Sequence, residues 1–208
     1  MMKVESMVLG MVQTNCYLLS DRESGACIIV DPADSPQKII SRIQAEHYEP
    51  VAILLTHGHY DHILAVEALR KEYSVQVYAA RAEEALLGDP GANLSLYIGG
   101  ESYSTKADVY LSDQEEFTLA GHKIKAILTP GHTSGSMCYY FQDSGFLISG
   151  DMVFCESVGR TDFPTGNSAE IISSLKEKIF ALPDGTIIYP GHGPSTDVAH
   201  EKAYNPYA

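Results

Sequence analysis

The stretch THGHYDH, residues 56–62, places three histidines and a carboxylate within six residues. It follows directly on the apolar run at residues 51–55, whose length and composition predict a strand buried on both faces. The polar cluster is therefore expected just past a strand end. In a chain with eight histidines, this pattern has chance odds on the order of one in a thousand, which favours a functional role.

The composition is that of a globular chain with an acidic surface. With 208 residues, of which 45% are hydrophobic, the chain can bury a large core, and we expect one domain over residues 1–208. Fourteen basic residues against 27 acidic residues give a net charge of −13, which repels phosphate backbones and anionic membrane surfaces. We therefore expect neither nucleic acid nor a membrane as a partner.

The amino-terminal stretch and the cysteines indicate a cytoplasmic location. The stretch MMKVESMVLG lacks the apolar core of a signal peptide, and no later stretch approaches the roughly 20 apolar residues of a membrane span. The four cysteines are widely spaced without a Cys-x-x-Cys pair. This spacing favours reduced thiols that serve as small core residues over a disulfide framework.

Strand and helix patterns alternate along the chain and predict an α/β fold. Apolar or β-rich runs predict strands at residues 4–9, 16–20, 26–30, 51–55, 75–79, 116–119, 123–128, 137–141, 146–149 and 186–189. Helical spacing predicts helices over residues 36–48, 61–72 and 168–180, a short one ending at 87 and another from about 196. Ser35 is expected to cap the first helix, and Asn167 with Glu170 to form a capping box. Residues 82–107 have weak periodicity and are expected to form a loop-rich insertion.

Three further predicted strands are each followed by one histidine or aspartate. His132 lies in TPGHT, Asp151 in SGD and His192 in PGHG. One such histidine alone is more often a hydrogen-bonded loop residue, but together with THGHYDH these residues suit a metal site. The other histidines lie outside any such pattern and are expected to be solvated surface residues: His47, His122 and His200.

Imidazole nitrogens and carboxylate oxygens are ligands for zinc and related divalent ions. His57 and His59 project to the same side of an extended backbone, so they can bind one ion together. His132 is expected to complete this first site.

A second ion is expected to bind Asp61, His62 and His192, with Asp151 as the bridge between the two ions. Two dications carry +4, and the two aspartates with a bound hydroxide remove three charges, which leaves about +1 in an acidic protein. We therefore expect a small-molecule substrate with an anionic group, or a reaction that develops an oxyanion.

The chain resembles the metallo-β-lactamase superfamily. The motifs THGHYDH, TPGHTSGS, SGD and PGHGP occur in this order, together with Thr14-Asn15-Cys16-Tyr17 and Asp31, across nearly the whole chain. The resemblance implies a four-layer αββα sandwich with the metals at one edge of the sheets. The stretch GRTDFP at residues 159–164 and the ending GHGPSTDVAHEKAYNP are similar to short bacterial glyoxalase II-like hydrolases, which resemble hydroxyacylglutathione hydrolases.

The resemblance implies the same allocation of ligands and a reaction. In glyoxalase II relatives, the residues that hold the first metal match His57, His59 and His132. Those that hold the second metal match Asp61, His62 and His192, and the residue that bridges the two metals matches Asp151. The implied cofactors are two divalent ions, with zinc expected and iron or manganese as alternatives. The implied reaction is hydrolysis of a thioester such as S-lactoylglutathione by a metal-bound hydroxide. Asp61 and Asp151 are then catalytic as well as metal-binding.

Other residues are candidates for supporting roles. Asp31 and Thr133 could hold ligands in orientation, with local hydrogen bonding at strand ends as the alternative. Arg160 and Asp162 stand in place of the family's lysine and tyrosine downstream of the bridging aspartate, so Arg160 could bind a substrate carboxylate or pair locally with Asp162.

Sixteen residues follow His192, so we expect no appended helical domain of the kind that binds glutathione in full-length glyoxalase II. The insertion carries side chains that could cover the site or form a plain surface loop: Leu94, Leu96, Tyr97 and Tyr103.

Other activities stay open at this point. The GRTDFP stretch also resembles persulfide dioxygenases, in which two histidines and an aspartate hold one iron; here these would be His57, His132 and Asp151. A nucleic-acid processing or binding role occurs in this superfamily, but the charge of −13 argues against it. A β-lactamase is disfavoured, because Asp151 stands where the common zinc β-lactamases place cysteine and His62 completes a different second site. The sequence leaves open the acyl group, the thiol carrier and the oligomeric state.

Overall fold

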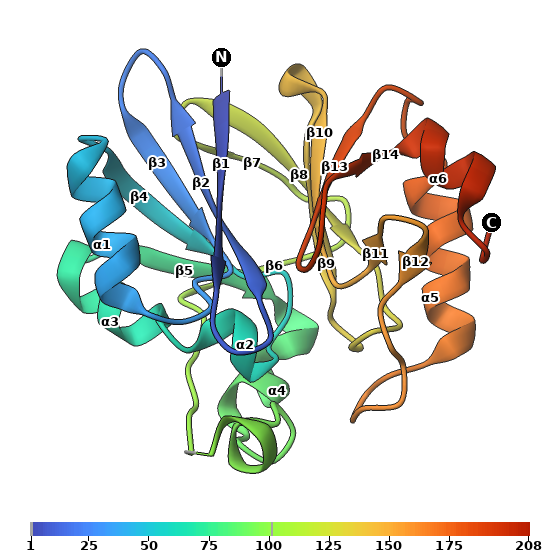
Figure 1. Ribbon diagram of the computed structural model, residues 1–208, viewed down its shortest axis with the longest axis horizontal. Coiled ribbons are helices and arrows are strands. Elements are labelled where there is room, and N and C mark those ends of the chain that lie inside the picture. The colour runs from blue at the N-terminus through green and yellow to red at the C-terminus, as the bar shows by residue number, and fades with distance from the viewer. Residues whose placement is uncertain (1, 101) are drawn as a thin grey trace.

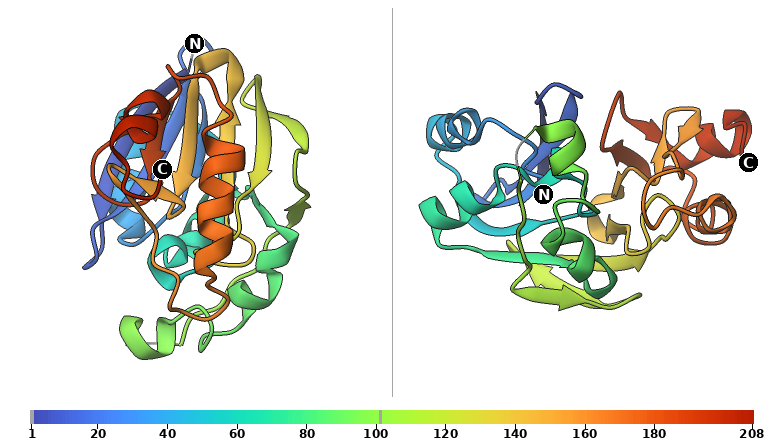
Figure 2. Two further views of the ribbon diagram at one scale, coloured as in Figure 1. Left: turned by 90° about the vertical axis from the view of Figure 1, so that its right-hand side faces the viewer. Right: turned by 90° about the horizontal axis from the view of Figure 1, so that it is seen from below.

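Two six-stranded sheets pack face to face and helices cover their outer faces, as Figure 1 shows for the computed structural model, which describes residues 2–100 and 102–208. The side view in Figure 2 places helices α5 (Ser168–Ser174) and α6 (Val198–Tyr204) outside the second sheet. The predicted four-layer αββα sandwich in a single domain is confirmed. Among the described residues, no helix is long and apolar enough to cross a membrane.

The first sheet comes from the amino-terminal half of the chain. Its strands lie in sequence order: β1 (Met2–Leu9), β2 (Thr14–Asp21), β3 (Ala26–Val30), β4 (Glu49–Leu54), β5 (Gln76–Ala80) and β6 (Val109–Leu111). Strands β1 to β3 are antiparallel, and β3 to β6 are parallel. Parallel neighbours need crossover connections, which here contain helices α1 (Pro36–Ala45) and α3 (Val66–Tyr73).

The second sheet has the order β14-β13-β10-β9-β8-β7. Its strands are β7 (Glu116–Leu119), β8 (His122–Leu128), β9 (Met137–Phe141), β10 (Phe146–Gly150), β13 (Ile187–Pro190) and β14 (Thr196–Asp197). Only the pair β10 and β13 is parallel among the pairs within this sheet, and helix α5 and the π-helical turn η4 (Leu175–Ile179) lie in its crossover. Smaller elements complete the fold: α2 (Tyr60–Ile63), η1 (Arg81–Glu83), α4 (Glu84–Gly88), η2 (Ser95–Gly99), η3 (Gln142–Ser144), β11 (Val153–Phe154) and β12 (Ser157–Val158).

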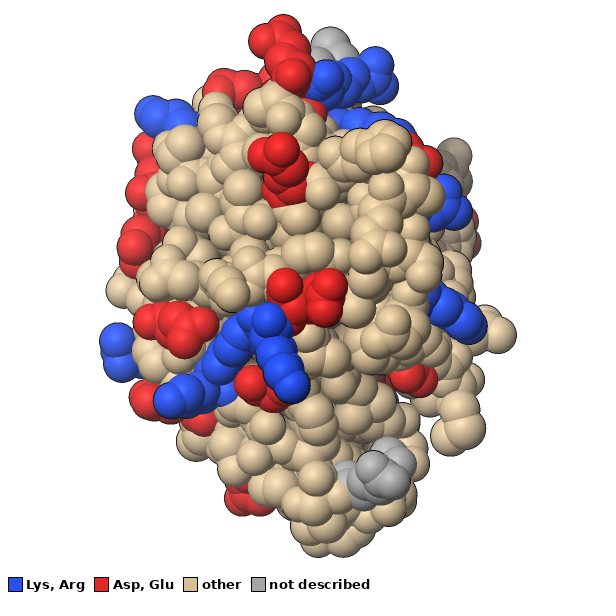
Figure 3. All heavy atoms as spheres, turned by 90° about the vertical axis from the view of Figure 1, so that its left-hand side faces the viewer, with Lys and Arg blue, Asp and Glu red and all other residues tan. Residues whose placement is uncertain are grey.

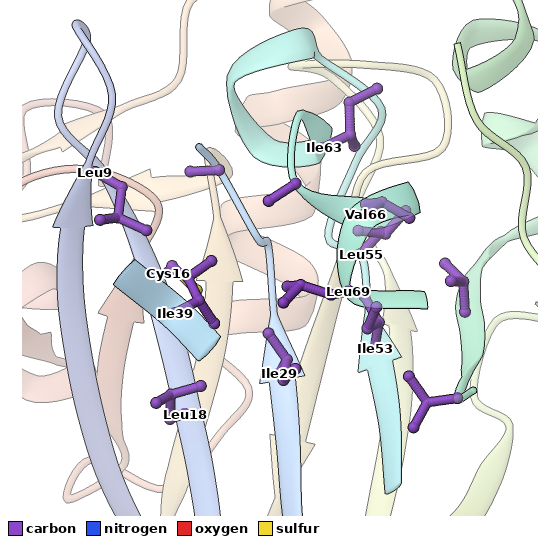
Figure 4. Packing of buried hydrophobic residues seen from close by; sticks show 14 of the residues in the cluster. Leu9, Cys16, Leu18, Ile29, Ile39, Ile53, Leu55, Ile63, Val66 and Leu69 are labelled. Carbon is purple, nitrogen blue, oxygen red and sulfur yellow. The ribbon is translucent and has the colours of Figure 1, made fainter. Parts of the chain in front are cut away.

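Successive residues of the central strands enter different cores, because side chains alternate across a strand. Leu18 and Ile53 point outward and pack under α1 and α3, where Ile39 and Leu69 cover them (Figure 4). Leu54 lies in the core between the two sheets. This explains the uninterrupted apolar run at the end of β4. The cysteines are free thiols, as expected, and three of them are fully buried: Cys16, Cys27 and Cys138.

The helix predicted over residues 61–72 is wrong as one element, since the chain forms α2 and α3 with a break between them. The backbone N–H of Ala65 donates to the carbonyl of Pro32 instead of to a carbonyl in the preceding helical turn. The short helix α2 can therefore direct Asp61 and His62 to the edge of the sheets, while α3 packs on the outer face.

Other boundaries differ from the predictions for local reasons. Ser35 has a left-handed backbone (φ 50°) and makes no side-chain cap bond. Asn167 caps α5 by accepting hydrogen bonds from the N–H groups of Ala169 and Glu170, but its own N–H donates to the carbonyl of Gly131, so the predicted capping box with the Glu170 side chain does not form. Strands β6, β11 and β12 were not predicted because each has only two or three residues. The closing helix begins at Val198, after the short strand β14.

A buried hydrogen bond between the two sheets near the site predicts a stability effect. The hydroxyl of Tyr139 on β9 donates to the carbonyl of Leu55, just after β4, at 2.7 Å. Tyr139→Phe leaves this buried carbonyl unpaired, so we expect the free energy of unfolding in urea to fall by about 1–2 kcal/mol.

The matched control is Tyr140→Phe, the same chemical change at the next residue of β9. Tyr140 faces the helix layer and its hydroxyl has no protein partner within residues 2–100 and 102–208, so the expected change is below about 0.5 kcal/mol. Equal losses in the two variants would show that the inter-sheet bond adds no stability.

Candidate metal centre

All seven predicted ligands meet at one edge of the sandwich. The chain segments after β4, β8, β10 and β13 carry them there, and α2 lies at this edge, below the sheets in Figure 1. Their ligand atoms form three groups in which all atoms lie within 4.8 Å of one another: His57, His59 and His132; His57, His62 and Asp151; Asp61, His62 and His192.

The first group has the spacing of ligands around one ion. The Nε2 atom of His132 lies 3.2 Å from Nε2 of His57 and 2.9 Å from Nδ1 of His59. Ligands at about 2.1 Å from a tetrahedral zinc ion stand about 3.4 Å apart. The three histidines therefore fit one cation without a large rearrangement.

The second group has similar spacing, and Asp151 lies between the groups. The Oδ2 atom of Asp61 is 3.3 Å from Nε2 of His192 and 3.5 Å from Nε2 of His62. The carboxylate of Asp151 lies 3.4 Å from His62 and 3.5 Å from His192, and also 3.6 Å from His132 of the first group. Asp151 is thus placed to contact two ions.

The bonding of two of these atoms also suits a cation. The Nε2 atom of His62 and the Oδ1 atom of Asp151 are buried and face each other at 3.4 Å, but neither makes a regular hydrogen bond in the described structure. A buried polar atom left unpaired costs about 1–3 kcal/mol, so such atoms are uncommon in native folds. A divalent cation would be a partner for both atoms.

The electrostatics of the pocket separate the histidines into two kinds. Burial lowers the pKa of His57 well below its usual range and that of His59 to about 3, which keeps both imidazoles neutral, the form that binds metals. Burial also opposes protonation of His192, but hydrogen bonds to Asp151 and Asp61 outweigh burial and raise its pKa to about 9. The two carboxylates thus attract positive charge into the pocket.

Outer hydrogen bonds set the tautomer of three ligands. The Nδ1–H group of His62 donates to Asp31 at 2.9 Å, and that of His132 donates to the carbonyl of Arg160 at 2.7 Å. Thr56 donates its hydroxyl to Asp31 and accepts from Nδ1–H of His57 at 3.1 Å. In each case the Nε2 lone pair is left facing the centre. Of the two alternatives that the sequence left for Asp31, the structure shows the contact that orients a ligand.

Thr133 makes no such contact with a ligand in the described structure. Its hydroxyl donates at 2.8 Å to Glu83, which the sequence analysis did not single out. Glu83 is 1% exposed and also accepts from the N–H groups of Gly58 and Gly135, so one carboxylate joins the loops of His57 and His132. No motif marks Glu83 in the sequence, because its role depends on two loops that are distant in the chain.

The stretch Thr14–Asn15–Cys16–Tyr17 supports the second group of ligands. The hydroxyl of Thr14 donates to Asp61 at 2.7 Å. The side chain of Asn15 donates to the carbonyls of Pro190 and Gly193 at 2.9 Å each, on both sides of His192. These contacts hold the loop of His192 against the first sheet.

Arg160 forms the local ion pair that the sequence left as one alternative. Its guanidinium makes two hydrogen bonds of 2.7 Å with Asp162 and lies 3.8 Å from the ring centroid of Phe163. Arg160 also lines the pocket next to the centre. Its role in binding a substrate stays a prediction.

The insertion contributes two side chains to the pocket. Leu94 and Ile98 line it, whereas Leu96 is 51% exposed and Tyr97 is 77% exposed and neither lines it. Tyr103 packs against the core, and its hydroxyl accepts a hydrogen bond from the backbone of α3. Leu94 was thus a candidate from sequence, while Ile98 was missed.

The remaining histidines lie outside the centre. His47 is exposed as expected, but the prediction for His122 is wrong, because its side chain is 16% exposed and lies 3.0 Å from Asp21. His200 pairs with Glu156 at 3.0 Å and lies near Cys155 and Glu201. The carboxylate of Glu201 accepts hydrogen bonds from the backbone of Glu156 and from two side chains, which accounts for its burial without a metal.

The family assignment follows from comparison with known proteins. Residues 9–192 match the Metallo-beta-lactamase superfamily. The chain belongs to this superfamily. Within it, the chain is 38% identical over 208 residues to the probable metallo-hydrolase YqgX of Bacillus subtilis, with 99% of this chain and 97% of the relative covered. It is 31% identical to hydroxyacylglutathione hydrolase GloC of Haemophilus influenzae, with 99% of this chain and 98% of GloC covered.

Solved structures of this superfamily share the fold closely. The BLEG-1 B3 metallo-beta-lactamase superimposes with a TM-score of 0.94 at 37% identity, covering 99% of both chains. TTHA1623 in a di-iron-bound form superimposes with a TM-score of 0.86 at 32% identity, covering 98% of this chain and 100% of TTHA1623. ETHE1 from Myxococcus xanthus superimposes with a TM-score of 0.80 at 26% identity, covering 98% of this chain and 83% of ETHE1.

The contact between Asp31 and His62 predicts a loss of metal affinity in Asp31→Asn. Oδ1 of Asp31 accepts from the backbone N–H of Thr56 at 2.8 Å, so the new amide NH₂ must take the other position and face Nδ1 of His62. The imidazole then carries its proton on Nε2 and loses the lone pair that faces the centre. We expect zinc affinity, measured by competition with a chelator, to fall about 10–100-fold.

Asp34→Asn is the matched control, because Asp34 lies on the same loop and bonds to the backbone of Ser35 rather than to a ligand. Its zinc affinity should equal that of the unmodified protein. The orienting role of Asp31 is refuted if both variants bind zinc equally well.

Proposed function

We propose that the chain is a metal-dependent hydrolase of acyl thioesters of the S-lactoylglutathione, or hydroxyacylglutathione, type. The observation that carries the proposal is the convergence of seven ligands in two groups that share Asp151. The relative GloC is named a hydroxyacylglutathione hydrolase, which supports the thioester as substrate class.

The proposed cofactors are two divalent ions, with zinc expected and iron or manganese as alternatives. The neighbour TTHA1623 was solved in a di-iron-bound form, which supports a dinuclear centre and keeps iron open. Divalent ions held here would polarise a thioester carbonyl and lower the pKa of a water molecule at the centre.

The protein's own residues hold this centre in place. Asp31 and Thr56 fix the imidazoles of His62 and His57, and Thr14 fixes the carboxylate of Asp61. In the reaction, the oxygen of water bonds to the acyl carbon, the carbon–sulfur bond breaks, and a carboxylic acid and a thiol are released. This route needs no nucleophile from the protein.

Hydrolysis of β-lactams is a second candidate function. The neighbour BLEG-1 is described as a B3 metallo-beta-lactamase and is 37% identical to this chain. Water also adds to an acyl carbon in that reaction, with cleavage of a carbon–nitrogen bond. The thioester is preferred because of the relative GloC.

A mononuclear iron persulfide dioxygenase is the third candidate. The neighbour ETHE1 is 26% identical, and His57, His132 and Asp151 are close enough to share one ion. Against this reading, the ligands Asp61, His62 and His192 also form a complete group. That group would have no role in a one-iron mechanism.

We propose a small anionic substrate and no nucleic-acid or membrane partner. On the face that carries α1, basic side chains lie among acidic ones (Figure 3). Arg42 on this helix pairs with Glu5 and Glu46 rather than standing free for phosphate contacts. A cytoplasmic location stays part of the proposal and fits the free thiols.

The proposed function predicts thiol release from S-lactoylglutathione by metal-loaded protein, and Asp61→Ala should abolish most of it. Loss of a direct ligand should lower kcat/KM by more than the roughly 10–100-fold that outer hydrogen-bond partners cost. The control Asp184→Ala removes an exposed carboxylate that pairs with Lys202 and should leave kcat/KM within about twofold.

The same preparation should be assayed with a β-lactam and, for oxygen consumption, with glutathione persulfide. A fully active Asp61→Ala variant would contradict the two-ion scheme. Metal-loaded protein that releases no thiol, but opens the β-lactam or consumes oxygen, would replace the proposed function with that activity.

A further inference from the structure

The pocket beside the candidate metal centre is apolar over most of its wall. It has a volume of about 530 Å³ and reaches His59, Asp61, His132, Asp151 and His192 at its base. Six apolar side chains form most of the remaining wall: Val12, Leu94, Ile98, Phe154, Val158 and Phe163. A group bound next to the ions would therefore lie against hydrocarbon.

Four separate segments supply this wall, one of which is the loop between β12 and α5 that carries Phe163. Val12 lies in the turn between β1 and β2, Leu94 and Ile98 lie in the insertion, and Phe154 and Val158 lie in the β11–β12 hairpin. Apolar groups also contact the ligands themselves. The ring of Phe163 lies 5.8 Å from that of His59, and the ring of Phe154 lies 6.1 Å from that of His192.

The insertion is built to hold Leu94 in this place. Leu94 has a left-handed backbone (φ 72°), which is unfavourable for leucine, and is 7% exposed. Its neighbours Asn93 and Ser95 are fully buried and bond to each other and to the carbonyl of Tyr103. These hydrogen bonds fix the backbone around Leu94 and keep its side chain in the wall.

The rim of the pocket is also apolar and partly open to water. Ile98 is 43% exposed and Val12 is 44% exposed. Single exposed apolar residues are common, but here they converge on one pocket next to a charged centre. A ligand that covers them would gain about 25 cal/mol for each Å² of apolar surface removed from water.

The wall has few polar groups for a charged carrier. Apart from the ligands, the polar side chains that line it are Tyr60, Ser157 and Arg160. The hydroxyl of Tyr60 is itself buried, and the Nε and Nη2 groups of Arg160 both donate to Asp162, whose charge offsets that of the guanidinium. The described residues therefore offer the two carboxylates of glutathione little compensation.

We propose that the acyl group of the substrate is an apolar chain, which packs between the insertion and the β11–β12 hairpin. The inference rests on the proposed thioester hydrolysis but changes its acyl group: larger hydrocarbon acyl groups are preferred over the small hydroxylated lactoyl group. The thiol carrier extends from the pocket towards solvent and contributes little to selection.

The test uses metal-loaded protein and two series of thioesters. The first series keeps glutathione as the thiol and varies the acyl group from lactoyl and acetyl through butanoyl to hexanoyl. Each buried methylene should raise kcat/KM about fourfold, so each pair of methylenes adds about fifteenfold. The second series keeps hexanoyl and replaces glutathione with coenzyme A or N-acetylcysteamine, which should change kcat/KM less than about fivefold.

Ile98→Ser and Leu96→Ser form a matched pair in the same insertion. Ile98 lines the pocket and Leu96 does not, and both are partly exposed, so neither change should disturb folding. Ile98→Ser should lower the ratio of hexanoyl to acetyl kcat/KM about tenfold, whereas Leu96→Ser should leave this ratio unchanged.

The outcomes separate this inference from the proposed function. Hydrolysis of every thioester with no rise along the acyl series, or with lactoyl preferred, would overturn the apolar acyl group and leave the hydrolase intact. A preference that follows the thiol carrier would also overturn it. Metal-loaded protein that cleaves none of the thioesters would overturn both.

Discussion

The structure depends on two carboxylates that are held among histidines at the edge of a sandwich. Burial favours the neutral form of Asp61 and of Asp151, yet the neighbouring histidines lower the pKa of Asp61 to about 2 and that of Asp151 well below its usual range. Both groups are thus anionic at neutral pH. Charges in such surroundings require compensation by cations, since an isolated buried charge costs far more than a native fold can offset. The surrounding structure positions the groups that provide this compensation.

Close backbone approach makes the arrangement of ligands feasible. A side chain at Gly191 would collide with the carboxylate of Asp151, and one at Gly150 (φ 52°) would collide with Thr56. Outside this layer, Asp31 and Glu83 each gather several hydrogen bonds that fix the ligand loops. The positions of the ligands are therefore set by packing and hydrogen bonds of the polypeptide. The same edge of the fold carries the apolar pocket, so the candidate metal centre and the wall beside it come from different segments of the chain.

Local patterns in the sequence predicted the parts of the fold that local physics determines. The motif THGHYDH and the single histidines or aspartates after later strands predicted a cluster that the structure brings together, because strand ends meet at a sheet edge. The break after α2 was not predictable, since it depends on a hydrogen bond from Ala65 to Pro32, more than 30 residues away. Glu83 was missed for the same reason. Arg160 left two alternatives that only the position of Asp162 could distinguish, and its substrate role stays a prediction.

The most direct test of the account is anomalous X-ray diffraction from crystals of the metal-loaded protein, collected above and below the absorption edge of the bound metal. The account predicts two peaks, one among His57, His59 and His132 and one among Asp61, His62 and His192, with Asp151 in contact with both. A single peak in the first group would favour the one-metal chemistry instead. No peak at this edge of the sheets would contradict the metal centre itself.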